Sequence, residues 1–196
     1  MKKNIYIPCN NYNIHLVSNG AENYNNIALC FHGFNGDKWG DAYAGLKHIE
    51  MNSLVCSFDS CGHGDSPISS LDMRLDIILE EIDEVVSFLK KNEPSKPIIL
   101  IGLSYGAYRI MQYLIKYHPS IEKVIFINPV LNILETLEMT KEFKYLKLKE
   151  NELVPMKRSL NKYMTKAFLD DLYQNNLYKS NYTFSYNVGY IFRNKR

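Results

Sequence analysis

The sequence predicts an α/β fold in which helices cover both faces of a mostly parallel sheet of about six strands. Four apolar runs have the length and composition of strands buried on both faces, namely 27–31, 53–58, 97–101 and 124–127. Segments with helical spacing separate these runs, and the connecting loops are short. Polar loops follow the runs directly, so the candidate functional residues gather at the carboxyl edge of the sheet.

One domain with a substantial core is expected for a chain of 196 residues. The chain begins with two short strand patterns, 5–9 and 12–17, on either side of the turn Asn10-Asn11. This arrangement predicts an antiparallel hairpin at one edge of the sheet. After the first apolar run a helix is predicted, because apolar residues recur with helical spacing at Trp39, Tyr43, Leu46 and Ile49.

The clearest predicted helix spans residues 71–91. Its apolar residues form one stripe, made of Leu71, Leu75, Leu79, Ile82, Val86 and Leu89. Acidic residues and lysines occupy the opposite face, which we therefore expect to be solvated. Pro94 and Pro97 end this helix and lead into the next apolar run.

The pentapeptide Gly102-Leu103-Ser104-Tyr105-Gly106 stands between an apolar run and a segment with helical spacing. This order of strand, G-x-S-x-G and helix predicts a nucleophile elbow, a strained turn that lifts the serine hydroxyl clear of the sheet. The two glycines leave room where neighbouring backbone passes close. The amide after the serine lies at a helix N-terminus, where it can face a developing negative charge.

Two further motifs follow apolar runs, His32-Gly33-Phe34 and the segment from Asp59 to Ser66. Together with the elbow, and in this order, they make the sequence similar to α/β-hydrolases over residues 25–175. Within that fold it most resembles the group of serine aminopeptidases, monoacylglycerol lipases and cinnamoyl esterases. The resemblance implies hydrolysis of a small acyl ester through a serine acyl-enzyme, with no metal ion and no organic cofactor.

The resemblance also implies a role for each motif residue. Ser104 would be the nucleophile, and the backbone amides of Phe34 and Tyr105 would form the oxyanion hole. One such donor typically stabilises the transition state by ~3 kcal/mol. His32 and Gly33 would orient the oxyanion loop, so we expect His32 to be structural and not a catalytic base.

The loop from Asp59 to Ser66 contains further polar residues that are catalytic candidates by residue type alone. We expect His63, which stands between two glycines, to stabilise the loop. Asp59 and Asp65 are expected to bind backbone amides of the same turn, as aspartates in such turns do. None of the three is expected to be the acid or base of a catalytic triad.

The acid and base that should accompany Ser104 are not found in the sequence. In this fold they follow the nucleophile, and the one later histidine is His118. Fourteen helical residues at about 1.5 Å each would place His118 ~21 Å from Ser104, too far for proton transfer. The last two core strands of the resembled family, which carry these groups, are missing before Arg196. We therefore expect impaired activity, a catalytically dead remnant that still binds a ligand, or completion of the site by a partner chain.

The expected organisation is a hydrolase core over residues 1–130, a helical cap over 131–180 and an atypical tail over 181–196. In the tail, apolar and polar residues alternate from Tyr182 to Phe192. This pattern fits either an edge strand paired with 124–127 or an out-of-family tail left by a frameshift or truncation, and we prefer the second interpretation. Without a cover, the apolar strand 124–127 would favour a homodimer or aggregation.

Composition argues against several other classes of protein. The net charge of +2 is spread over interspersed acids and bases, unlike a surface that binds nucleic acid. No apolar run reaches the ~18 residues of a membrane span, and the first residues lack the apolar stretch of a signal peptide. A cytoplasmic protein with reduced thiols is expected, and no zinc-site spacing is found among Cys9, Cys30, Cys56 and Cys61.

Overall fold

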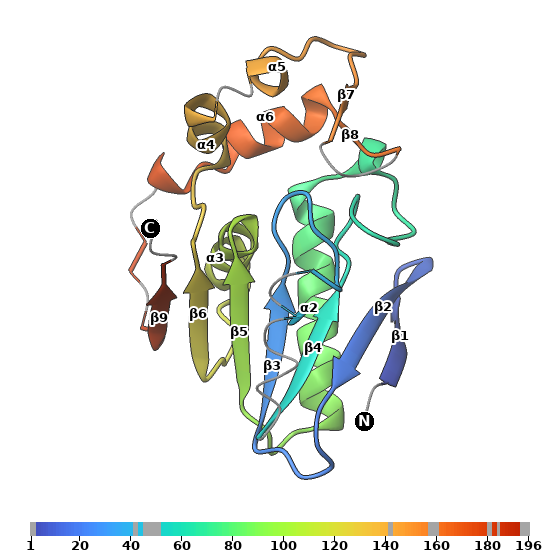
Figure 1. The fold of residues 1–196 in the computed structure, drawn as a ribbon, viewed down its shortest axis with the longest axis vertical. Coiled ribbons are helices and arrows are strands. Elements are labelled where there is room, and N and C mark those ends of the chain that lie inside the picture. Colours follow the sequence, from blue (N-terminus) through green and yellow to red (C-terminus); the bar gives the residue numbers. More distant parts are fainter. Residues whose placement is uncertain are drawn as a thin grey trace.

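A computed structural model describes residues 3–40, 43–44, 52–140, 143–156, 161–179, 182–183 and 185–192. Its centre is a seven-stranded sheet with the order β1-β2-β4-β3-β5-β6-β9 (Figure 1). The strands are β1 (Lys3–Cys9), β2 (Tyr12–Asn19), β3 (Asn26–Phe31), β4 (Ser53–Phe58), β5 (Ile98–Leu103), β6 (Lys123–Ile127) and β9 (Val188–Ile191). β2 is antiparallel to both of its neighbours, and all other pairs are parallel. This confirms the predicted mostly parallel sheet with an N-terminal hairpin.

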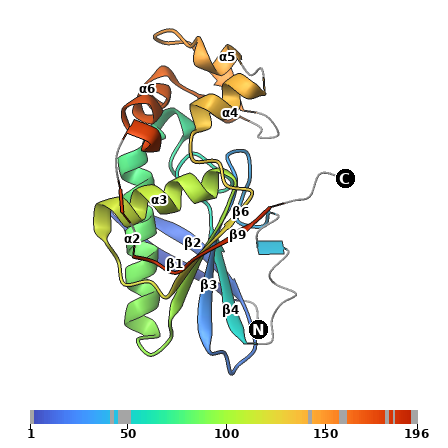
Figure 2. The ribbon, with the colours of Figure 1, turned by 90° about the vertical axis from the view of Figure 1, so that its left-hand side faces the viewer.

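Helices α2 (Leu75–Asn92) and α3 (Tyr105–Tyr117) lie on the same face of the sheet (Figure 2). Their inward side chains form the main apolar core with that face. On the opposite face, Tyr43 packs with Val17 and Val55 in a second, smaller apolar cluster. The helix predicted around Tyr43 lies largely outside the described residues.

Helix α2 begins at Leu75, later than the predicted start at residue 71. Leu71 lies instead in a short 3-10 turn, η1 (Ser70–Asp72), and 48% of its surface is exposed. The turn is capped by the Ser69 hydroxyl, which accepts the Leu71 amide at 3.1 Å. The rest of the predicted stripe is buried as expected.

Between β6 and β9 the chain forms a cap over the carboxyl ends of the parallel strands (Figure 1). Its elements are α4 (Ile133–Met139), α5 (Phe143–Leu146), β7 (Val154–Pro155), β8 (Tyr163–Met164), α6 (Lys166–Gln174) and η2 (Leu177–Lys179). Helix α6 begins at Lys166, because the Thr165 side chain caps it by accepting the Phe168 amide at 3.2 Å.

Three hydrogen bonds attach the cap to the helices beneath it. The Asp171 carboxylate accepts the Leu75 amide at 2.6 Å and so caps α2, whose own N-cap residue provides no side-chain bond. The Asn175 carbonyl accepts from the Tyr108 hydroxyl at 3.0 Å and from the Gln112 side chain at 2.5 Å. Since both of these donors lie on α3, the cap is fixed above the junction of β5 and α3.

The strand β9 lies beside β6 at the edge of the sheet (Figure 1). The two strands pair in parallel from Val124 opposite Val188 to Ile127 opposite Ile191. This pairing supports the edge-strand interpretation of the tail over the one we preferred. The strand is shorter than the alternation from Tyr182 predicts. The sheet nevertheless has one strand more than we expected, because β9 continues it beyond β6. The open edge is therefore β9 and not the apolar strand β6.

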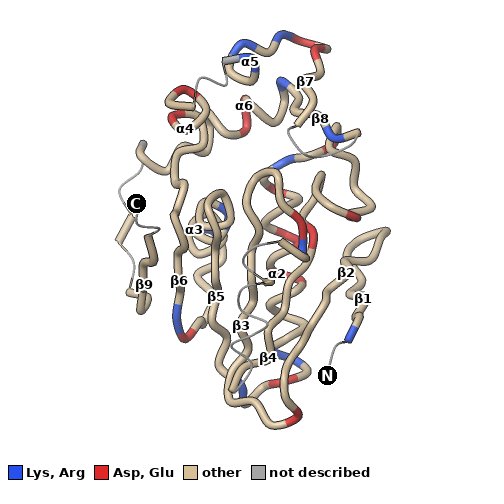
Figure 3. The backbone as a smooth tube through the Cα atoms, viewed as in Figure 1, with Lys and Arg blue, Asp and Glu red and all other residues tan. Residues whose placement is uncertain are grey.

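No helix among the described residues is long and apolar enough to cross a membrane. Acidic and basic positions are interspersed along the backbone (Figure 3). All four cysteines are buried and free. Burial raises the pKa of Cys61 to about 12, so this thiol is not a reactive thiolate at neutral pH.

Candidate active site

Ser104 occupies a strained turn between β5 and α3. Its backbone has φ 53° and ψ −117°, a conformation that residues other than glycine rarely adopt. The turn is held against the end of β6, because the Ser104 amide donates to the Ile127 carbonyl at 3.0 Å and the Val130 amide donates to the Ser104 carbonyl at 3.1 Å. The hydroxyl forms no hydrogen bond with any described residue.

Close backbone approach explains the glycines around this turn. A Cβ at Gly102 would lie 2.7 Å from the Ala107 amide nitrogen, and a Cβ at Gly106 would overlap the Phe31 carbonyl oxygen. A Cβ at Gly33 would lie 3.6 Å from the Ser104 Cβ. The loop after β3 therefore lies directly beside the candidate nucleophile, as the predicted site requires.

Phe34 and Tyr105, the candidate oxyanion-hole residues, contact each other across the two loops. Their rings meet edge to face with centroids 5.4 Å apart. Phe168 of the cap stacks on Phe34 with centroids 6.4 Å apart, which joins the cap to this loop. Neither the Phe34 amide nor the Tyr105 amide donates to a described residue, so both remain candidates for binding a ligand oxygen.

His32 directly follows β3 and is buried beneath the same loop. Its Nδ1 lies 2.8 Å from the Gly33 carbonyl oxygen, and its Nε2 accepts the Ser60 amide at 3.4 Å. Burial, with the nearby charge of Arg109, lowers the pKa of His32 well below its usual value. A neutral ring that joins two loops fits the structural role expected for this residue.

His63 is buried beside His32, with ring centroids 4.9 Å apart. Its Nε2 lies 2.6 Å from the Phe34 carbonyl oxygen, and its Nδ1 lies 3.0 Å from the Cys61 carbonyl oxygen. Each of the four nitrogens of the two rings therefore lies near a backbone polar atom. A neutral His63 ring can donate to only one of its two carbonyls. Neither imidazole forms a hydrogen bond with Ser104 among the described residues.

A buried ion pair ties the loop after β3 to the loop after β4. The Lys38 ammonium lies 2.5 Å from an Asp59 carboxylate oxygen, and the two side chains are only 1% and 3% exposed. Asp59 also accepts the backbone amides of Lys38 at 2.7 Å and of Asp65 at 2.8 Å. Asp59 thus binds an amide of its own turn, as predicted, and holds the neighbouring loop as well.

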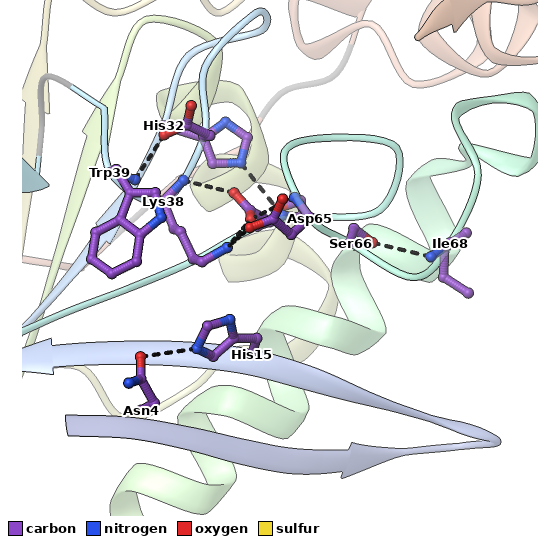
Figure 4. A network of polar contacts seen from close by, with 11 residues as sticks. Asn4, His15, His32, Lys38, Trp39, Asp65, Ser66 and Ile68 are labelled. Carbon is purple, nitrogen blue, oxygen red and sulfur yellow. Dashed lines mark hydrogen bonds and ion pairs between the residues drawn. The ribbon is translucent and has the colours of Figure 1, made fainter. Parts of the chain in front are cut away.

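Asp65 departs from the prediction that it binds amides of the turn. Its exposed carboxylate instead pairs with the Lys38 ammonium at 2.9 Å (Figure 4). Burial by itself would lower the pKa of Lys38, but the hydrogen bonds to Asp59 and Asp65 outweigh burial and raise it. The ammonium is therefore held in its charged form between a buried and an exposed carboxylate.

Arg109 on α3 is fully buried and joins the same two loops from the helix side. Its guanidinium donates to the His32 carbonyl and to the Ser60 hydroxyl, and it lies 5.3 Å from the ring centroid of Tyr105. Sequence reasoning missed this residue, because a single arginine on a helix is usually solvated. The one feature of the sequence that could have indicated its burial is its position within the apolar segment that follows Ser104.

Glu81 on α2 is buried, although the sequence predicted a solvated acidic face. Its carboxylate accepts the Cys61 amide at 2.7 Å and the Tyr12 hydroxyl at 3.2 Å. Burial outweighs these hydrogen bonds and raises the pKa of Glu81 to about 7. Glu81 therefore anchors the loop after β4 on α2 and was also missed.

No histidine among the described residues is placed to act as a base for Ser104. His118 follows α3 at the end remote from the turn, as the predicted distance required. His15 lies on β2, where its ring stacks on Tyr6 at 4.8 Å. His48 lies outside the described residues. The structure thus places the loop after β3 and the buried residues that hold it beside Ser104. Within the part of the chain that it describes, it places no acid–base pair there.

Acidification is expected to destabilise the protein through His63. Burial and the charge of Arg109 lower the His63 pKa from 6.5 to about 4. Between these values the unfolded chain binds a proton that the folded protein does not. The stability present above pH 6.5 is therefore lost as the pH falls toward 4, by roughly 3 kcal/mol. His32 adds to this loss, whereas the raised pKa of Glu81 opposes it between about pH 7 and 4.5.

Urea unfolding measured from pH 8 to pH 4 tests this prediction. His63→Asn should lose markedly less free energy of unfolding than the wild type over this range. His118→Asn is the matched control, since His118 has a left-handed conformation that asparagine adopts readily, and it should keep the wild-type pH dependence. Identical pH profiles for the wild type and His63→Asn would contradict the assignment.

Residues 24–188 match the model of the family described as serine aminopeptidase, S33. Among curated proteins, the chain is similar to the proline iminopeptidase of Saccharolobus solfataricus, with 27% identity over 128 residues. The matched stretch is 65% of this chain and 40% of that relative. The match therefore spans less than half the length of the relative.

Solved structures show the same fold. Est1E from Butyrivibrio proteoclasticus, solved with ferulic acid bound, superimposes with a TM-score of 0.67 and 20% identity over 88% of this chain and 70% of that one. The esterase EaEST from Exiguobacterium antarcticum gives a TM-score of 0.56 and 17% identity over 74% and 58% of the two chains. At these identities the likeness shows the architecture and leaves the chemistry to be argued from the site.

Proposed function

Because the chain belongs to the serine aminopeptidase S33 family and has the α/β-hydrolase fold, we propose that it is an acyl-ester hydrolase with Ser104 as nucleophile. The observation that carries the proposal is the turn of Ser104. Its φ of 53° is a strained value, and its hydroxyl has no partner among the described residues. Backbone strain of this kind clusters at active sites, and a nucleophile elbow needs it.

The proposed reaction starts with attack of the Ser104 hydroxyl oxygen on the carbonyl carbon of a small acyl ester. The alcohol leaves, and an acyl-enzyme remains. The amides of Phe34 and Tyr105 would bind the carbonyl oxygen as it gains negative charge. Water would then cleave the acyl-enzyme and release the carboxylic acid. The residues that would support these loops without touching the substrate are His32, Gly33, Asp59 and His63.

The proton of Ser104 needs an acceptor, and none is placed for it among the described residues. The nitrogens of both buried imidazoles point to backbone polar atoms of their own loops, and none of them forms a hydrogen bond with Ser104. We therefore expect slow turnover from the 196 residues by themselves. Loss of triad members lowers a rate by several orders of magnitude but leaves residual catalysis from the oxyanion hole and binding. A further segment or a partner chain that supplied the missing groups would restore the rate.

The lack of a proton acceptor for Ser104 among the described residues favours a second candidate function, a binding module that catalyses no reaction. Its ligand would lie between the Ser104 turn and the cap, which Asp171 and Asn175 attach to the helices beneath. Such a module would form no covalent adduct at Ser104 and would hydrolyse no ester above background. Covalent labelling therefore separates the two candidates.

We also propose that two copies associate through the open edge of β9. Its exposed apolar residues favour such pairing, with Tyr190 57% exposed, Ile191 54% exposed and the neighbouring Phe192 69% exposed. Sedimentation as a strict monomer at high protein concentration would argue against this association.

Ser104→Ala is expected to abolish labelling by a tagged fluorophosphonate, because the labelled atom is the serine oxygen. Hydrolysis of p-nitrophenyl acetate and butyrate, slow in the wild type, should fall to the background rate. Ser95→Ala, at an exposed loop position, is the matched control and should label like the wild type. Labelling that persists in Ser104→Ala would remove Ser104 as the nucleophile, and an unlabelled wild type would favour the binding module.

A further inference from the structure

We propose that the protein has a second ligand site at the end of the sheet opposite Ser104, which takes a small uncharged apolar molecule with one hydroxyl group. The site is a cavity of about 460 Å³ between the N-terminal hairpin and the last turns of α2. Small-molecule pockets have volumes of about 300–1,000 Å³, so the cavity is large enough for a ring-sized ligand. The proposal is independent of the reaction proposed for Ser104.

The cavity lies at the amino ends of the parallel strands. Leu54, which lines it, is the second residue of β4, whereas Ser104 follows the last residue of the parallel strand β5. Ile5 of β1 and Ser18 of β2 line the cavity from the sheet, and Phe88 lines it from α2. The three apolar side chains among these would contact the body of the ligand.

Ser18 gives the cavity its polar specificity. The residue is 1% exposed, and its hydroxyl oxygen has no hydrogen-bond partner among the described residues. Buried hydroxyls nearly always have a partner, and an unpaired one is costly. Less than 1 Å² of this oxygen is accessible, although Ser18 lines the cavity. Rotation of the short side chain about χ1 would turn the oxygen toward the cavity, where a hydroxyl group on the ligand could both donate to it and accept from it.

The charges around the cavity argue for an uncharged ligand. Glu22 and Glu93 line it together with Lys3, so both signs are present. An ionic ligand of either sign would meet repulsion as well as attraction. It would also have to leave water for a cavity whose exposed surface is mainly apolar, which is unfavourable for a charge.

Titration of the ¹⁵N-labelled protein with 2-phenylethanol, followed by NMR, tests the site. Saturable shifts are expected at the amides of Ser18, Leu54 and Phe88. Ser18→Ala should bind about 2- to 10-fold more weakly, the effect of one neutral hydrogen bond. Ethylbenzene, which lacks the hydroxyl, should bind equally to both proteins. Phenylacetate, which carries a negative charge, should bind more weakly than 2-phenylethanol.

Ser57→Ala is the matched control, because Ser57 is also a buried strand serine but already donates to the Cys30 carbonyl at 3.2 Å. It should leave the affinity for 2-phenylethanol unchanged. Ser18→Ala should fold normally, since it leaves no group unpaired, and urea unfolding should show stability equal to the wild type or higher. The proposal is overturned if no saturable shift occurs, if Ser18→Ala binds 2-phenylethanol as tightly as the wild type, or if the shifts map to the Ser104 turn.

Discussion

Replacement of Gly106 by alanine is expected to lower the free energy of unfolding by about 3–5 kcal/mol and to leave little soluble protein. The added methyl group would overlap the Phe31 carbonyl oxygen and lie 3.0 Å from the Phe31 Cβ. Phe31 belongs to β3, which pairs with strands on both sides and cannot move away. The better helix propensity of alanine offsets only about 1 kcal/mol of this cost.

Gly189→Ala provides the control for the Gly106 variant. Gly189 lies on β9, and the nearest atom to a Cβ there would be 3.8 Å away, an ordinary contact. The free energy of unfolding should change by no more than about 0.5 kcal/mol. Soluble yield and urea unfolding measure both variants. Equal stability of the two would show that α3 does not press against β3 as closely as described.

Lys38→Met is expected to lower the free energy of unfolding by about 3 kcal/mol. The substitution keeps the length of the side chain but leaves the buried Asp59 carboxylate without its cation. Breaking a buried pair in this way typically costs about 3–5 kcal/mol. The lower value is expected because Asp59 keeps two backbone amide donors. For a chain of this size, the melting temperature should fall by about 6–12 °C.

Asp65→Asn is the control for Lys38→Met, because Asp65 pairs with the same ammonium but its side chain is 80% exposed. An exposed pair contributes about 0–1 kcal/mol, so this variant should be nearly as stable as the wild type. Thermal and urea unfolding compare the two. If Asp65→Asn were as damaging as Lys38→Met, the exposed pair and not the buried one would hold the loops together.

Sequence reasoning succeeded where one short pattern decides the structure. The apolar runs predicted β3, β4, β5 and β6 because a strand buried on both faces needs little else. The turn of Ser104 was found because glycines before and after it are required wherever backbone passes so closely. Both are local properties, readable within about ten residues.

The buried charges could not be read in this way. Helical periodicity placed Glu81 on the solvated face, because the pattern depends on residue type and not on neighbours. Its partners, the Cys61 amide and the Tyr12 hydroxyl, come from distant parts of the chain. Lys38 and Arg109 are buried for the same reason, since each finds its acceptors on loops that only the finished fold brings close.

The pairing of the tail could not be settled from its sequence, because a strand is defined by its partner. The alternation after Tyr182 lacks the continuous apolar character of a central strand, so it looked foreign to the sheet. As the outer strand of the sheet, β9 pairs with β6 on one edge only, and its residues are half-buried or exposed, so it does not need the continuous apolar run of a central strand.

The parallel pairing of β9 also determines the order in which the sheet can be completed. Val124 and Val188 are 64 positions apart, whereas the two strands of the N-terminal hairpin are joined by a tight turn. Closing so long a loop costs more chain entropy and is slower than forming contacts between neighbours. The hairpin can therefore assemble early, while the outer side of β6 stays bare until the whole cap segment has been arranged. During that interval a nascent molecule presents an unpaired apolar strand to other chains, which is the stage at which misassembly competes with folding.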